Sequence, residues 1–324
     1  MHDDSSLYHV CELYFVQGMT MGAVAQRLQV SRSTVSRMLS LAKERGIVTV
    51  SLRIPTNPSD HTTRRMNELF GIRTHVAGTI KNANPTQQLE AASRYAANLL
   101  GDWITDGTVL GVAWGTTTSM VASHLRPSPV DDVTVVQLNG AVGPRSVGVS
   151  ASRPVLSTMA RAFNAELYSF PTPAFFDWEQ TRTQLWKESS IRHILSVRAS
   201  ADVAVFSVGA FHGPVLSQVY SEGYLNAETM RSLRENQVVG DICTVFIRED
   251  GTYADIEPNR RASGPTPTEL ARIPRRLCVA SGQHKVKGIL GALRSGAVTD
   301  LVIDDQTAAH ILTYMDARNT TPTR

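Results

Sequence analysis

The chain has 324 residues, 42% of them hydrophobic, which is enough apolar material for a sizeable core and, at about 150 residues per domain, for two domains. This composition excludes a fibrous, low-complexity or disordered chain. The formal net charge of +3, from 32 basic and 29 acidic residues, excludes a polycation, so any nucleic-acid-binding surface must be local.

Cysteine usage and the amino terminus narrow the class of protein further. Cys11, Cys243 and Cys278 lie far apart, and only Cys11 has a candidate metal ligand, His9, nearby, so neither a disulfide framework nor a structural zinc is expected. The first ten residues carry acids where a signal peptide needs basic and apolar residues, and no apolar run reaches the roughly 18 residues of a membrane span. We expect a cytoplasmic protein that uses no metal, no cofactor and no membrane.

The first 55 residues predict a small helical domain. Apolar residues recur at helical spacing between residues 7 and 15, Thr20 is placed to cap a second helix, and Ser31 to cap a third. The alternating segment Ile47–Ile54 predicts a strand, one side of a wing. Next comes Pro55–Asp60, a run of helix and strand breakers. We place the linker there, with one domain over residues 1–55 and another over 56–324.

The second and third helices match a helix-turn-helix. Its two helices pack through apolar residues at set positions, which here are Val24, Ala25, Leu28, Val30, Val35 and Met38. Gln29 stands in the turn where glycine is common, so a slightly different turn is expected. Residues 21–54 hold six basic residues and one acid, a local net charge of +5. The alternative is a three-helix bundle that serves dimerisation.

The exposed face of the third helix is the candidate recognition surface. Small hydroxyl residues and arginines are the types that enter the major groove, reach base edges and hold phosphates. The expected DNA-binding residues are Ser31, Arg32, Ser33, Thr34, Ser36 and Arg37.

After the linker, helical patterns alternate with short, β-branched apolar runs. The expected strands are 109–113, 133–138, 203–208, 277–280 and 301–303, and the expected helices are 87–103, 153–163, 227–236, 285–295 and 306–316. Strands that are apolar on both faces and separated by helices predict a mostly parallel sheet covered on both sides. The fold class is therefore α/β. For the helix over 87–103, a place in the core is favoured over a place in an interface.

Two strand–loop–helix segments are candidate anion sites. In the first, Gly115, Thr116 and Thr117 form a small-residue loop before a helix expected to open near Met120, and free N–H groups at a helix start suit a phosphate. The alternative is that the hydroxyls of residues 116–119 only cap the helix. In the second, Lys285 stands at a helix start, where a cation is unfavourable unless an anionic partner offsets it. A surface lysine at a frayed helix end is the alternative.

Other polar clusters have simpler explanations beside the functional one. Asp241 lies between two apolar segments, where it is suited to hold a sugar hydroxyl or to form an ordinary helix-to-strand turn. For residues 259–261 the alternatives are an anion clamp and an exposed loop, and the loop is favoured. For Asp304–Asp305 they are a metal site and a helix cap, and the cap is the simpler explanation. No nucleotide-binding glycine motif, GxSxG elbow, HExxH motif or paired histidine spacing occurs.

Several separated motifs in one order resemble the SorC family of sugar-responsive bacterial transcriptional regulators, from the helix-turn-helix to near residue 315. They are Gly111–Thr117, Val135–Gly140, Ala201–Ala204, Val239–Ile242, Lys285 with Ala292–Gly296, and Leu301–Asp305 before Ala308. The segment Phe206–Gly209 departs from the family, which often has a more glycine-rich strand end there. This departure concerns one wall of the expected pocket and so the identity of the effector.

The resemblance implies a small N-terminal helix-turn-helix domain followed by a Rossmann-like effector domain related to sugar-phosphate isomerases, which has lost catalysis. It also implies a phosphorylated sugar or related metabolite as effector, operator DNA as partner, and a homodimer or homotetramer. By matching motifs, Gly115, Thr116 and Thr117 would hold the phosphate. Asp241 would hold the hydroxyls and Lys285 the phosphate or carbonyl end, while Gln137 and Asn139 would line the pocket.

A DNA-binding regulator controlled by a phosphorylated sugar is therefore the leading hypothesis, with no enzymatic activity. The alternative is a sugar-phosphate isomerase or lyase that carries a DNA-binding domain. An isomerase needs a general base beside the substrate carbon, and Asp241 is the one plausible candidate. Lys285 is suited to form a Schiff base with an aldehyde effector, which would be covalent sensing without turnover.

Overall fold

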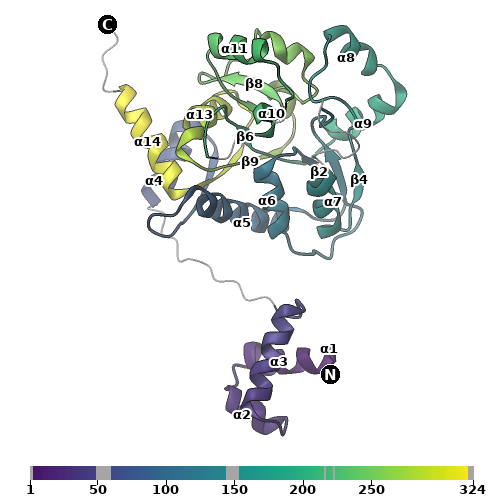
Figure 1. Cartoon of the computed structure of the whole chain (residues 1–324), viewed down its shortest axis with the longest axis vertical. Coiled ribbons are helices and arrows are strands. Elements are labelled where there is room, and N and C mark those ends of the chain that lie inside the picture. Colours follow the sequence, from purple (N-terminus) through teal and green to yellow (C-terminus); the bar gives the residue numbers. More distant parts are fainter. Residues whose placement is uncertain (1–2, 49–59, 144–152, 215–216, 222, 320–324) are drawn as a thin grey trace. The chain divides into compact units, whose positions relative to one another are not determined.

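The computed structural model describes residues 3–48, 60–143, 153–214, 217–221 and 223–319. The chain divides into two compact units, Met1–Ile54 and Pro55–Arg324 (Figure 1). Each unit is described by itself below.

The N-terminal unit is a small helical bundle. Helix α1 (Asp4–Cys11) runs into a π-helical turn (Glu12–Val16), and helices α2 (Met21–Arg27) and α3 (Arg32–Glu44) follow. The predicted caps are confirmed, since the hydroxyls of Thr20 and Ser31 accept the backbone N–H groups of Ala23 and Thr34. The core consists of buried apolar residues from all of these helices: Leu7, Val10, Cys11, Leu13, Val24, Ala25, Val35, Met38, Leu39 and Ala42.

The turn between α2 and α3 differs in one respect from the expected packing. Gln29 takes the left-handed backbone conformation, with φ 53°, that glycine adopts most easily. Val30, expected to pack inside, is instead 37% exposed, because the turn carries its side chain outward. The predicted strand Ile47–Ile54 lies from residue 49 onward outside the described residues, and so does the predicted linker up to residue 59.

The larger unit is built on a parallel sheet of seven strands in the order β1-β10-β9-β5-β2-β3-β4. The strands are β1 (Arg73–Ala77), β2 (Val109–Val112), β3 (Thr134–Gln137), β4 (Glu166–Tyr168), β5 (Val203–Phe206), β9 (Arg275–Ala280) and β10 (Asp300–Asp304). All five expected strands are among them, although the strand expected over 203–208 ends at Phe206 and Val208 belongs to a strand of another sheet. The α/β class with a parallel sheet is confirmed.

Both faces of the sheet are covered by helices. Alternate strand residues such as Val112, Val205 and Val279 belong to one core with α5 (Pro85–Trp103), α6 (Thr116–His124) and α7 (Arg153–Ala162). The intervening residues, such as Phe206 and Ile303, belong to the opposite core with α4 (Asp60–Phe70), α13 (Val286–Arg294) and α14 (Asp305–Asn319). This double burial explains why the strands read as apolar runs without polar alternation.

The expected helices form with small shifts at their ends. Helix α5 starts two residues earlier than predicted, because Asn84 and Gln87 form a capping box around Pro85 at the first helical position. Its residues Ala92 and Ala96 are fully buried, which confirms a core role. Helix α6 starts at Thr116, earlier than the expected opening near Met120.

A second, antiparallel sheet was not foreseen. Its strands are β6 (Val208–Gly209), β7 (Val238–Ile242) and β8 (Val245–Arg248). Cys243 and Thr244 join β7 to β8 with φ values of 49° and 70°, a two-residue hairpin loop of the kind that usually contains glycine or asparagine. Asp241 therefore lies within a strand, and the alternative that it forms a helix-to-strand turn is wrong.

The remaining segments are short helices around these two sheets. They are α8 (Glu179–Leu185), α9 (Ser189–Ala199), α10 (Gln218–Ser221), α11 (Ala227–Glu235), α12 (Pro267–Leu270) and the 3₁₀ helices η2 (Glu257–Arg261) and η3 (Gln283–Lys285). Within the described residues, no helix has both the length and the apolar character that a membrane span would need.

Candidate functional site

A cavity lies at the carboxyl ends of three neighbouring parallel strands, β9, β5 and β2. These strands are followed by Ser281, Ser207 and the loop to Thr116, all of which line the cavity. From β2 the chain continues to β3 on one side, whereas from β5 it continues to β9 on the other, so the strand order reverses between β2 and β5. Ligands of open α/β sheets bind in the crevice at such a reversal.

The cavity is small. Its free volume of about 80 Å³ is room for several water-sized groups.

The start of α6 forms one wall of the cavity. Gly115, the residue before the helix, has φ 149° and provides no side-chain cap, so the first N–H groups of α6 are not used by it. Thr118 donates its hydroxyl to the Gly115 carbonyl, whereas Thr116 and Thr117 line the cavity. This arrangement favours an anion site at the helix start over hydroxyls that only cap the helix.

Asp241 lies at the opposite wall, on β7. Its Oδ2 accepts the N–H of Thr244 at 3.1 Å, and its Oδ1 has no hydrogen-bond partner among the described residues. Burial raises the pKa of Asp241 to about 6, against the opposing effects of the Tyr220 hydroxyl, the Thr244 N–H and the positive charge of Lys285. The carboxylate is therefore a buried acceptor beside the Tyr220 hydroxyl, and it lines the cavity.

The close fit around Asp241 depends on Gly209. A Cβ atom at Gly209 would lie 1.9 Å from Asp241 Oδ1, so only glycine permits the neighbouring strand to approach. Gly209 belongs to the segment in which the sequence departs from the family, and the structure places Ser207, Val208 and Gly209 in the cavity wall.

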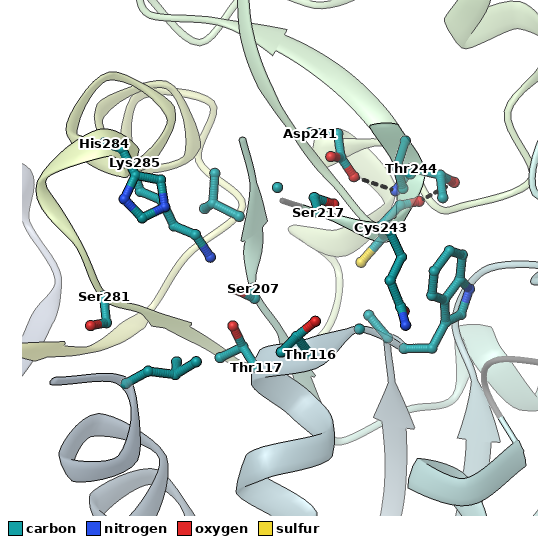
Figure 2. Close-up of a pocket in the computed structure, with 18 of the residues that line it drawn as sticks. Thr116, Thr117, Ser207, Ser217, Asp241, Cys243, Thr244, Ser281, His284 and Lys285 are labelled. Atoms are coloured by element: carbon teal, nitrogen blue, oxygen red, sulfur yellow. Dashed lines mark hydrogen bonds between the residues drawn. The ribbon is translucent and has the colours of Figure 1, made fainter. Parts of the chain in front are cut away.

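Lys285 ends η3 immediately before α13, and its side chain points into the cavity between His284 and Thr117 (Figure 2). Burial lowers the pKa of Lys285, opposed by the nearby Cys278 and Asp241 groups. Because a cation at a helix start opposes the helix dipole, this position suits a lysine that meets an anionic ligand.

Unpaired polar atoms gather around this cavity. Of the eleven buried side-chain polar atoms that lack a partner in the described part of the chain, five belong to cavity residues: Asn139, Ser207, Asp241, Ser281 and His284. Buried polar groups are normally hydrogen-bonded, so the concentration of exceptions points to a polar ligand. Sequence reasoning singled out Asn139 and Asp241 but missed Ser207, Ser281 and His284, for which the only signal was their position just after a strand.

The structure does not bring Gln137 to the cavity. Its amide group donates to the Asn139 carbonyl at 2.7 Å and accepts the Phe170 N–H at 2.9 Å. Both the donor and the acceptor of this buried amide are thus used within the protein, and Gln137 supports the loop that carries Asn139. Of the seven expected effector residues, the other six line the cavity.

The other polar clusters have structural roles. Asn259 exchanges hydrogen bonds with the backbone of Phe246, and Arg261 is paired with Glu257. Asp304 accepts the Thr307 N–H and so caps α14, as the simpler explanation predicted. Among the residues that the structure describes, no group of three or more His, Cys, Asp or Glu side chains is placed to hold a metal ion.

In the N-terminal unit, the expected DNA-binding residues lie at the start of α3. Arg32, Ser33, Ser36 and Arg37 are exposed. The Ser31 hydroxyl bonds to the hydroxyls of Ser33 and Thr34 and caps the helix, so part of this polar set is already used locally. Arg37 Nε donates to the Ser33 carbonyl at 3.4 Å.

Comparison with known proteins relates both units to transcriptional regulators. The family model described as "Putative sugar-binding domain" matches residues 54–313. The "Deoxyribonucleoside regulator" of Bacillus subtilis (strain 168) is 32% identical over 91% of this chain and 93% of its own. The "Sorbitol operon regulator" of Klebsiella pneumoniae is 26% identical over 94% of this chain and 96% of its own.

Solved structures show the same architecture. A domain of a possible sugar-binding transcriptional regulator from Arthrobacter aurescens TC1 matches with a TM-score of 0.73 and 34% identity, covering 81% of this chain and 100% of that one. The full-length sorbitol operon regulator SorC from Klebsiella pneumoniae shares the fold with a TM-score of 0.79 at 24% identity, covering 96% and 99%. The chain belongs to the SorC family of sugar-responsive bacterial transcriptional regulators.

Proposed function

We propose that this protein is a DNA-binding transcriptional regulator of a carbohydrate-metabolism operon, and that a phosphorylated sugar or related small metabolite controls its operator binding. The observation that carries the proposal is the cavity at the reversal of strand order, where a helix start, a lysine and unpaired acceptors converge. Residues 1–55 would bind DNA, and residues 56–324 would bind the effector and mediate assembly.

The two ends of the cavity suit the two ends of such a ligand. The first N–H groups of α6, with Thr116, Thr117 and Lys285, supply donors and positive charge for a phosphate. Asp241 Oδ1 and Asn139 Oδ1 are acceptors without partners in the described structure, and they suit sugar hydroxyls. An apolar ligand would leave both of these ends unmatched.

Catalysis is not part of the proposal. Asp241 is the single carboxylate among the described residues that line the cavity, so an isomerase or lyase would have to use it both to hold the substrate and to move protons. The similar proteins reported above carry the names of regulators, which favours sensing over turnover. Product formation from a panel of sugar phosphates would restore the enzyme hypothesis.

The first test concerns the effector. In a thermal-shift screen over phosphorylated sugars and their unphosphorylated parents, a bound compound raises the melting temperature with the logarithm of its concentration. Lys285→Ala and Thr117→Val should abolish this shift and the response of operator binding, while the variants still bind the operator without effector. Lys287→Ala, which removes an exposed lysine two residues away, is the matched control. A normal response in either pocket variant would refute the assigned pocket.

The second test concerns DNA. Arg32→Ala and Arg37→Ala should each weaken operator binding by about 1–3 kcal/mol and relax sequence preference if the side chains contact base edges. Arg126→Ala, an exposed arginine of the larger unit, is the control. Binding should also weaken steeply as salt rises. Unchanged operator affinity in both α3 variants would overturn the assignment of this helix.

The third test concerns assembly. One helix-turn-helix covers only a few base pairs, so a homodimer or homotetramer that presents paired half-sites is proposed. Light scattering at micromolar concentration, with and without operator, should give the mass of an oligomer. A monomer under both conditions would contradict this part of the proposal.

A further inference from the structure

His284 is a cavity residue whose ring is held in place by backbone on both sides. It lies on η3, one residue before Lys285, and is half-buried. A Cβ atom at Gly213 would lie 2.3 Å from His284 Cδ2, and one at Gly282 would lie 2.6 Å from Cε1. Both glycines have φ values that other residues rarely adopt, 141° and 105°. The backbone at these two glycines therefore confines the imidazole ring, unlike the ring of a mobile surface histidine.

The ring nitrogen Nε2 is unused in this position. It is buried and has no hydrogen-bond partner among the described residues. Burial lowers the pKa of His284, and the positive charge of Lys285 lowers it further. The ring is thus uncharged at neutral pH in the free protein. An anion placed beside Lys285 would offset the lysine charge and raise the pKa of His284 again.

The charged groups around His284 do not offset the lowering of its pKa by Lys285, so a bound anion would have to do so. Lys285 follows it on η3, and Asp241 lies across the cavity on β7 (Figure 2). His212, next to Gly213, is exposed. Asp304, on the α14 side, is fully buried and is used by the Thr307 N–H. Of these groups, Lys285 is the one that lowers the pKa of His284.

We propose that His284 takes up a proton when the anionic group of the effector binds beside Lys285, and that it thereby acts as a specificity-determining residue for anionic ligands. This inference rests on the proposed function, because it concerns the same cavity. Protonation adds a second positive charge and a donor at Nε2. An anionic ligand is then favoured over its neutral parent, and its binding becomes tighter as pH falls.

Inorganic sulfate is a suitable probe, because it remains a dianion between pH 6 and pH 8, so any pH dependence comes from the protein. Sulfate affinity of the full chain is measured by calorimetry at pH 6 and pH 8, each in two buffers of different ionisation enthalpy to count protons taken up. One linked proton permits up to about a tenfold change in affinity per pH unit. We expect about tenfold tighter binding at pH 6 than at pH 8, with net proton uptake.

Three variants separate the groups that titrate. His284→Gln keeps a donor and should bring the ratio of affinities at pH 6 and pH 8 close to one. His212→Gln, the same substitution on the neighbouring exposed histidine, should retain the ratio of the parent protein. Asp241→Asn removes the cavity carboxyl whose pKa burial raises to about 6, and the part of the affinity ratio due to His284 should remain in this variant.

The outcomes distinguish this inference from the proposed function. Unchanged proton uptake in His284→Gln, loss of it in Asp241→Asn, or no sulfate binding at either pH would overturn the role of His284. The regulator proposal would survive each result if a sugar phosphate still shifts the melting temperature and changes operator binding. Conversely, a protein that binds sulfate with proton uptake at His284 but binds no operator would refute the regulator proposal alone.

Discussion

Replacing Asp241 by asparagine should stabilise the free protein while weakening the effector site. The rise in the pKa of this carboxyl from 3.8 to about 6, caused by burial, corresponds to a penalty of about 3 kcal/mol for holding the ionised form in the folded state. Asparagine avoids that penalty and keeps an oxygen to accept the Thr244 N–H. Its NH₂ group, however, loses water at a cost of about 1–2 kcal/mol.

The net gain in the free energy of unfolding is therefore about 1–2 kcal/mol at pH 8, or about 2–8 °C in melting temperature for a unit of this size. The sign of the pH dependence follows from the raised pKa. Below pH 3.8 both states are protonated and there is no penalty; between pH 3.8 and about 6 it grows, and above that it is complete. At pH 5 the ionisation penalty falls to about half, about 1.5 kcal/mol, so the net gain from asparagine should nearly vanish.

Thermal unfolding of Asp241→Asn and the parent protein at pH 8 and pH 5 checks this reasoning. Asp102→Asn, which changes an exposed carboxylate at the end of α5, is the control and should alter stability by less than about 0.5 kcal/mol. The effector affinity of Asp241→Asn should fall by about tenfold or more, because a charged acceptor for a hydroxyl is lost. Equal melting temperatures at pH 8, or a gain that does not depend on pH, would refute the argument.

Two further substitutions test how the scaffold supports the site. Gly209→Ala should abolish the effector response, because its Cβ would lie 1.9 Å from Asp241 Oδ1 and must displace the carboxylate; Gly101→Ala, where an added Cβ meets nothing within 4 Å, should leave the response intact in the same titration. Arg73→Ala should destabilise the protein by about 1–3 kcal/mol above pH 5, because it removes an ion pair of 2.7 Å from the fully buried Asp300. The pKa of Asp300 is lowered in the folded state, so the contribution of this pair is lost as pH falls, and unfolding curves of the two proteins should converge in acid.

Local features of the amino-acid sequence determined most of the secondary structure. Helix caps and buried helix faces depend on residues a few positions apart, so the sequence alone predicted the caps at Thr20 and Ser31 and the buried face of α5. The sequence also predicted the parallel strands, since burial on both faces demands uninterrupted apolar runs. The loops at Gly115–Thr117 and Lys285 were identified as candidate anion sites because each follows such a run.

Tertiary structure alone decided which of these polar residues meet. Thr117, Ser207 and Ser281 come together because β2, β5 and β9 are neighbours in the sheet, a pairing set by contacts between segments far apart in the chain. Asp241 arrives from a second, antiparallel sheet whose short strands leave only a weak pattern in the sequence. Whether a buried polar atom is left for a ligand depends on every group around it. That is why Gln137 proved to be used internally while His284, which no motif marks, keeps an unpaired nitrogen at the cavity.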